Sequence, residues 1–96
     1  MTSKQRAYLR SLSNKLEPIL HAGKGGISDA MIKQADDALT AREIIKGKVL
    51  ETAPATAREI AEQIAAAVNA EVVHVIGRTF VLFRQNKKDS QIKLPR

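Results

Sequence analysis

The stretch PILHAGKGGIS, residues 18–28, joins three local signals that decide how this chain begins to fold. Its apolar start, 18–22, predicts a short strand, and Ser28 at its end is a typical N-cap for a following helix. Between them lies the loop Gly23-Lys24-Gly25-Gly26. Glycine has no Cβ, so another molecule can approach the main chain closely. Because the loop opens onto a helix N-terminus and carries the Lys24 ammonium group, it is suited to bind an anion such as a phosphate.

Apolar residues at helical and strand spacing continue on both sides of this stretch. They predict a helix from a Ser3 cap to about Lys15, the strand 18–22, a helix from Ser28 to near Ala41, a strand over 43–50, a helix over 57–68, and a hairpin of strands 71–76 and 79–84. This order predicts an α/β fold in which a four-stranded mixed sheet packs with three helices. We expect each crossover helix to join neighbouring parallel strands. Gly47, inside a strand, predicts a bulge or a close backbone approach.

Length and composition limit the class of protein. The chain has 96 residues, 44% of them hydrophobic, and no cysteine. This predicts one domain over residues 1–96, with 85–96 as a flexible basic tail unless Ile92 and Leu94 dock. The lack of cysteine excludes disulfides, thiolate catalysis and cysteine-ligated zinc. The N-terminus does not resemble a signal peptide, and no apolar run approaches the roughly 20 residues of a membrane span, so we expect a cytoplasmic protein without membrane contact.

The charge is strongly basic and unevenly distributed. The formal net charge is +6, with the excess in residues 1–26 and 78–96 and a slightly acidic middle. Such basic segments favour binding to the phosphates of a nucleic acid, although net charge also keeps small domains soluble. With only Tyr8, Phe80 and Phe83 as aromatic residues, base stacking is not expected to dominate.

Several segments of this chain resemble one known family in the same order. They are the opening TSKQRAYLR (2–10), LEPI (16–19), GKGG (23–26) and the closing VIGRTFVLFR (75–84). Together they are similar to the CRM domain (chloroplast RNA splicing and ribosome maturation), over nearly the whole chain. A single domain of this kind resembles the bacterial YhbY-like branch. That branch implies association with precursors of the large ribosomal subunit, whereas the plant relatives imply intron splicing.

The resemblance also implies which residues contact RNA. The RNA-contacting loop of the family falls on Gly23, Lys24, Gly25 and Gly26, and its basic surface on Arg6, Arg10, Arg78 and Arg84. The chain departs from the family at two positions. Gly47 replaces a β-branched residue, so that strand is expected to be locally irregular, and Phe83 replaces a common tyrosine, so a hydroxyl contact would be lost.

The residues of the loop suggest how RNA would be held. We expect the main-chain N–H groups of residues 24–27 to face phosphate oxygens, with Lys24 acting as a point charge. Asp29, in the first turn of the next helix, would repel a phosphate on the helix axis, so the phosphate is expected beside the loop on the Lys24 side. Contacts of this kind position RNA without reading its sequence. The expected partner is ribosomal RNA in a precursor of the large subunit.

Other classes of function have weaker support in the sequence. Asp36 and Asp37 are adjacent on a helix and point in different directions, and no nucleophile, metal or cofactor set is recognisable, so we expect no enzyme and no small-molecule substrate. His21 could donate to a phosphate, but a structural role is favoured for it and more so for His74. The alternative is a protein-interaction module that docks acidic partners through its basic ends. The oligomeric state is left open.

Overall fold

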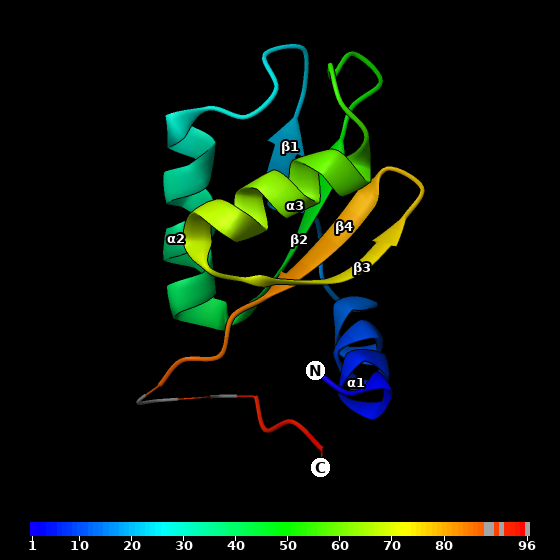
Figure 1. Cartoon of the computed structure of the whole chain (residues 1–96), viewed down its shortest axis with the longest axis vertical. Helices are drawn as coiled ribbons and strands as arrows, with labels where there is room; N and C mark the ends of the chain where they lie inside the picture. Colours follow the sequence, from blue (N-terminus) through cyan, green and yellow to red (C-terminus); the bar gives the residue numbers. More distant parts are fainter. Residues whose placement is uncertain (88–89, 91, 96) are drawn as a thin grey trace.

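The computed structural model describes residues 1–87, 90 and 92–95, and its elements follow the predicted order (Figure 1). They are α1 (Ser3–Ser13), β1 (Leu20–Ala22), α2 (Asp29–Arg42), β2 (Ile44–Val49), α3 (Ala57–Val68), β3 (Glu71–Ile76) and β4 (Thr79–Phe83). The predicted α/β class, with three helices and a four-stranded mixed sheet, is confirmed. Lys88, Asp89, Gln91 and Arg96 of the predicted tail lie outside the described residues. None of the helices among the described residues has the length and apolarity needed to span a membrane.

The strands lie in the order β1-β2-β4-β3. β1 and β2 are parallel neighbours joined through α2, as expected, whereas β4 is antiparallel to both β2 and β3. The expectation that α3 also joins neighbouring strands is wrong, because β4 lies between β2 and β3. The physical reason is burial: four successive residues of β4, Phe80–Phe83, are buried, and a strand that is apolar on both faces belongs inside the sheet.

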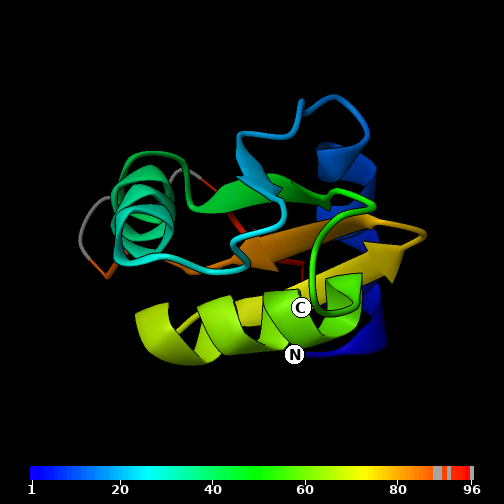
Figure 2. The ribbon, with the colours of Figure 1, turned by 90° about the horizontal axis from the view of Figure 1, so that it is seen from above.

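Two apolar clusters hold the layers together, one on each face of the sheet. The larger joins one face to α2 and α3 and includes Leu20, Leu39, Ile60, Phe80 and Leu82. The smaller joins the other face to α1 through Leu9, Ile44, Val73, Val81 and Phe83. Figure 2 shows α3 along one side of the sheet and α1 behind the right-hand end of the strands. Because α1 is short, it covers only part of its face.

Side-chain caps explain where the helices begin. Thr2 caps α1, since its hydroxyl accepts from the Gln5 N–H while the Gln5 side chain accepts from the Thr2 N–H. The predicted Ser3 cap is therefore one residue late, because this capping box requires the threonine–glutamine spacing. Ser28 caps α2 as predicted.

Gly47 marks a close approach and not a bulge. A Cβ built on Gly47 would lie 2.2 Å from Phe80 Cζ, so the buried ring occupies the space that any side chain would need. The pairing of β2 with both neighbours is continuous, and the expected irregularity of β2 is wrong. The register shift lies instead in β3, between Val72 and His74.

The C-terminal segment is held by a buried glutamate. Ile92 and Leu94 pack against the α1 cluster, which confirms the docking alternative for these two residues. Glu43, at the end of α2, is 0% exposed and has φ +67°. Its carboxylate accepts hydrogen bonds from the Asn86 N–H (2.8 Å), the Ser90 hydroxyl (2.9 Å) and the Ile92 N–H (3.0 Å).

Candidate nucleic-acid interface

The glycine loop lies at one end of the sheet together with the turn between β3 and β4. The loop follows Ala22, which pairs with Val49 at the end of β2. The neighbouring residue Lys48 pairs with Thr79, the first residue of β4, which directly follows the turn at residues 77–78. Figure 1 shows the glycine loop at the top of the view and the β3–β4 turn at the right, both away from α1. The fold thus brings Lys24 and Arg78 to the same end, although 53 positions separate them in the sequence.

The loop is a tight turn with Lys24 and Gly25 at its tip. The Gly26 N–H donates to the Gly23 carbonyl at 2.9 Å. That group is therefore used inside the loop, and the expectation that all N–H groups of residues 24–27 face a phosphate is wrong for Gly26. Lys24 and Gly25 are exposed, and within the described part of the chain their N–H groups, like that of Ile27, have no hydrogen-bond partner.

The glycines of the loop have different structural roles. Gly26 has φ +67°, and a Cβ on it would lie 3.3 Å from Pro54 Cγ, so the turn itself requires glycine there. A Cβ on Gly25 would meet nothing within 4 Å. Gly25 is thus the point where an outside molecule can approach the main chain, and it can be substituted without disturbing the fold.

The first turn of α2 is less open than the loop. Ser28 Oγ accepts from the Met31 N–H at 3.1 Å, which occupies one of the free N–H groups of the helix. Asp29 is exposed in the same turn and already complements the helix dipole. A phosphate beside the loop, near Lys24, remains the prediction.

Arg10 and Arg78 are exposed, but Arg6 is bound to the fold. Arg78 forms a solvent-exposed ion pair with Glu51 at 3.4 Å, which is weak and easily exchanged for a phosphate. Arg6 Nη1 donates to the carbonyls of Val72 (2.7 Å) and Val73 (2.9 Å). Those carbonyls lie at the register shift of β3, so Arg6 ties α1 to the irregular part of the sheet.

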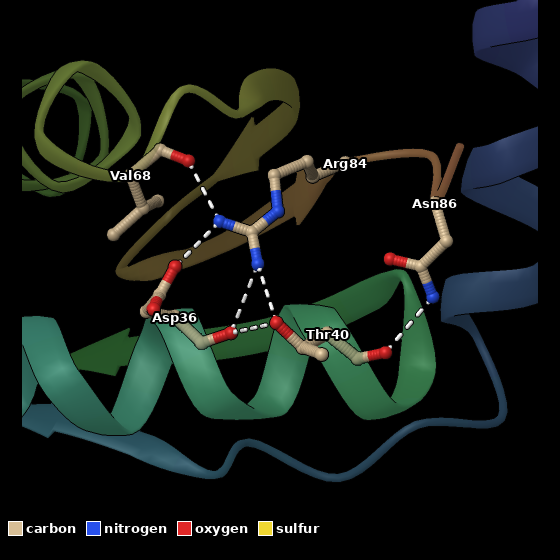
Figure 3. Close-up of polar contacts among 5 residues, drawn as sticks. All are labelled: Asp36, Thr40, Val68, Arg84 and Asn86. Atoms are coloured by element: carbon tan, nitrogen blue, oxygen red, sulfur yellow. Dashed lines mark hydrogen bonds and ion pairs between the residues drawn. The ribbon is translucent and has the colours of Figure 1, made fainter. Parts of the chain in front are cut away.

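Arg84 is also bound within the fold (Figure 3). Its Nη1 donates to Asp36 Oδ1 (2.7 Å) and the Val68 carbonyl (2.8 Å), and its Nη2 to the Asp36 carbonyl (3.0 Å) and Thr40 Oγ1 (2.8 Å). The guanidinium therefore joins α2 to the end of α3. Arg84 follows β4 at the end of the strand opposite to Arg78, so the two arginines are not brought together.

We expect Arg84→Ala to lower the free energy of unfolding by about 2 kcal/mol, because a charge-assisted network loses its central donor, the largely covered Arg84 guanidinium. Chemical denaturation followed by circular dichroism measures this change. The matched control is Arg58→Ala, which removes an exposed i,i+4 ion pair with Glu62 and is expected to change stability by about 0.5 kcal/mol or less. Equal effects of the two substitutions would contradict the structural role of Arg84.

The sequence interpretation missed two lysines in β2. Residues 44–49 read Ile-Ile-Lys-Gly-Lys-Val, and strand alternation places Ile45, Gly47 and Val49 toward α2 and α3. Lys46 and Lys48 consequently lie on the opposite face, where Lys48 is exposed. The period of two in this segment was the signal that could have identified them.

The histidines lie on that same face of the sheet. His21 is exposed on β1, and His74 is half-buried on β3. Partial burial, together with the positive charges of Arg10 and Lys46, lowers the pKa of His74 below its ordinary value. Over the described residues, no group of three or more histidine, cysteine or acidic side chains is arranged to hold a metal ion.

Comparisons of this chain with a family model, with other sequences and with solved structures all point to the same family. The family model of the CRS1/YhbY (CRM) domain matches residues 1–84. A Bacillus subtilis protein named "Probable RNA-binding protein YqeI" is 42% identical over 95 residues, which are 99% of each chain. A Haemophilus influenzae protein named "RNA-binding protein" is 30% identical and covers 100% of this chain and 96% of its own length. The solution structure of SAV1595 from Staphylococcus aureus, described as a candidate RNA-binding protein, superposes with a TM-score of 0.81 at 45% identity over 99% of each chain.

Proposed function

Because the chain belongs to the CRS1/YhbY (CRM) domain family, we propose that it binds RNA, and that it associates with precursors of the large ribosomal subunit and assists their assembly. The observation that carries this proposal is the tip of the glycine loop. Lys24 and Gly25 are exposed there, with main-chain N–H groups that have no partner among the described residues. Arg78 lies at the same end of the sheet, so its charge adds to the positive potential near the loop.

The contact is electrostatic and does not involve a chemical step. A phosphate of folded RNA would accept from the N–H groups of Lys24 and Gly25, while the Lys24 ammonium group neutralises its charge. Gly25 allows the sugar-phosphate chain to come close, because no Cβ intervenes. Arg10 and Arg78 supply further exposed charge. For Arg6 and Arg84, whose guanidinium groups are held by hydrogen bonds within the fold, the proposed contribution to RNA binding is long-range attraction.

We expect Gly25→Asp and Lys24→Gln each to weaken binding of a ribosomal RNA fragment without changing the free energy of unfolding. Lys24→Gln should cost about 5-fold in affinity at about 0.1 M salt and reduce the log-log salt slope by about 0.7 to 0.9, as expected for one lost phosphate contact. Gly25→Asp should cost more, because it places a carboxylate where the phosphate approaches. Fluorescence anisotropy across a salt series, together with denaturation curves, measures both quantities.

Lys33→Gln is the matched control for these loop variants. It removes the same charge from the exposed face of α2, where Lys33 pairs with Asp37 at 3.3 Å, and is expected to leave RNA affinity nearly unchanged. If the loop variants bind RNA as tightly as the parent protein, the loop is not the contact. Crosslinking in cells and mapping of the attached RNA tests the ribosomal part, with large-subunit precursor RNA as the expected product.

A further inference from the structure

One face of the sheet carries two neighbouring rows of residues that α1 leaves partly uncovered. In the first row, His21 of β1 pairs with Lys48 of β2, which pairs with Thr79 of β4, which pairs with Ile76 of β3. In the second row, Lys46 of β2 and His74 of β3 both pair with Val81 of β4. Paired residues share a face, so all these side chains lie opposite α2 and α3.

The position of α1 divides this face into a covered part and an open part. Leu9 of α1 packs over Ile44, Val81 and Phe83, which closes the half of the face nearest the C-terminal segment. The row nearest the glycine loop remains open, since His21 and Lys48 are exposed and Ile76 is 63% exposed. Arg10 of α1 and Lys46 of the second row both lie close enough to His74 for their positive charges to act on the imidazole.

The open part of the face has a one-signed charge pattern. We define the basic strip as His21, Lys46, Lys48, His74 and Arg10, which come from β1, β2, β3 and α1. The other members of the two rows, Thr79, Ile76 and Val81, are uncharged. Glu17 lines a shallow hollow beside Lys46, but Lys46 makes no ion pair within 4.0 Å to any acidic group of the described residues. The lysine and arginine charges of this strip repel one another without a counter-charge, and an anion that binds among them would offset this repulsion.

We propose that the basic strip is a second phosphate-binding surface, on which the RNA held by the glycine loop continues across the sheet toward α1. His21 lies two residues before the loop, so the strip and the loop form one continuous path. Lys46 and Lys48 are two positions apart on a strand, about 6.6 Å, a span that suits successive phosphates of an extended single strand. Ile76 offers an apolar contact for a sugar or base edge at the border of the strip. This inference rests on the proposed RNA-binding function, and it specifies the ligand as an extended single strand that runs from the glycine loop across the sheet.

The double variant Lys46→Gln/Lys48→Gln tests the strip. We expect its affinity for single-stranded ribosomal RNA to fall about 25-fold at about 0.1 M salt, and the log-log salt slope to fall by about 1.4, because two single-strand phosphate contacts are lost. In the parent protein, RNA should raise the pKa of the His74 ring in an NMR titration, because added phosphates favour the charged imidazole, and it should shift the ring resonances of His21. The neighbour of His74 on β4 is the uncharged Val81. The positive charges that lower the pKa of His74 come from Arg10 and Lys46, and bound phosphates would offset these charges.

The matched control is Lys33→Gln/Arg58→Gln, which removes two exposed charges from α2 and α3 on the other side of the sheet. It should lower affinity by about 2-fold or less. The strip is refuted if the strip variant binds RNA like this control, or if RNA leaves both histidine rings unchanged. The loop variants separate the two proposals: loss of affinity in Lys24→Gln but not in the strip variant refutes the strip alone, whereas a parent protein that does not bind RNA refutes both.

Discussion

Replacing Gly47 with alanine should lower the free energy of unfolding by about 3 kcal/mol, and replacing it with valine should prevent stable folding. The cause is the ring of Phe80, which is 1% exposed and whose Cζ, Cε2 and Cε1 atoms would lie 2.2, 2.6 and 2.8 Å from the new Cβ. No real Cβ tolerates such distances, and the ring is enclosed by the larger apolar cluster. The ring and strand β2 must therefore separate, which disturbs the central pair of the sheet.

Urea denaturation of the alanine variant measures this loss, and a second substitution tests its cause. Phe80→Leu removes the ring edge, so the double variant Gly47→Ala/Phe80→Leu should be more stable than the sum of the two single changes predicts, by at least about 1 kcal/mol. Gly25→Ala is the matched control, since its Cβ meets nothing within 4 Å and should change stability by about 0.5 kcal/mol or less. If Gly47→Ala and Gly25→Ala have the same effect, the close approach of Phe80 does not constrain the sheet.

The order of elements could be predicted from the sequence because it depends on local patterns. The apolar stripe of α3, the turn at Gly77 and the loop before Ser28 are each encoded within a few residues. Which strands become neighbours depends on distant residues. β4, and not β3, lies next to β2, because β4 is buried on both faces. The four consecutive apolar residues of β4 indicate this position, but the expectation that α3 joins neighbouring strands pointed to β3.

In the candidate site too, the features that depend on local sequence could be predicted, and those that depend on distant residues could not. The exposure of Lys24 and Gly25 follows from their place in a short turn, and the structure agrees with the sequence there. The arginines could not be sorted from sequence, because the acceptors of Arg6 and Arg84 lie on elements far along the chain. A guanidinium bonded to main-chain carbonyls and one open to solvent have the same local sequence signal. Lys48 differs from the arginines, because its exposure follows from the period-two alternation of β2, which Gly47 interrupts with a residue that has no side chain.

The second large effect is expected at Glu43. We predict that Glu43→Ala lowers the free energy of unfolding by about 3 to 4 kcal/mol, because the half-buried donors of Asn86, Ser90 and Ile92 lose their carboxylate acceptor. The same change should release the C-terminal segment, so that Ile92 no longer packs against the α1 cluster. Hydrogen exchange at the Asn86 and Ile92 amides, together with denaturation curves, measures both consequences.

Two comparisons isolate the carboxylate as the cause. Glu43 has φ +67°, a conformation that costs a non-glycine residue about 1 kcal/mol, so Glu43→Gly should be about 1 kcal/mol more stable than Glu43→Ala and still show fast exchange in the tail. In a chain that ends after Gln85, the donors are gone and water can reach the carboxylate. There Glu43→Ala should cost about 1 kcal/mol or less, because the interaction that it removes is already absent. If Glu43→Ala destabilises the shortened chain as much as the full chain, the glutamate supports α2 alone and does not hold the C-terminal segment.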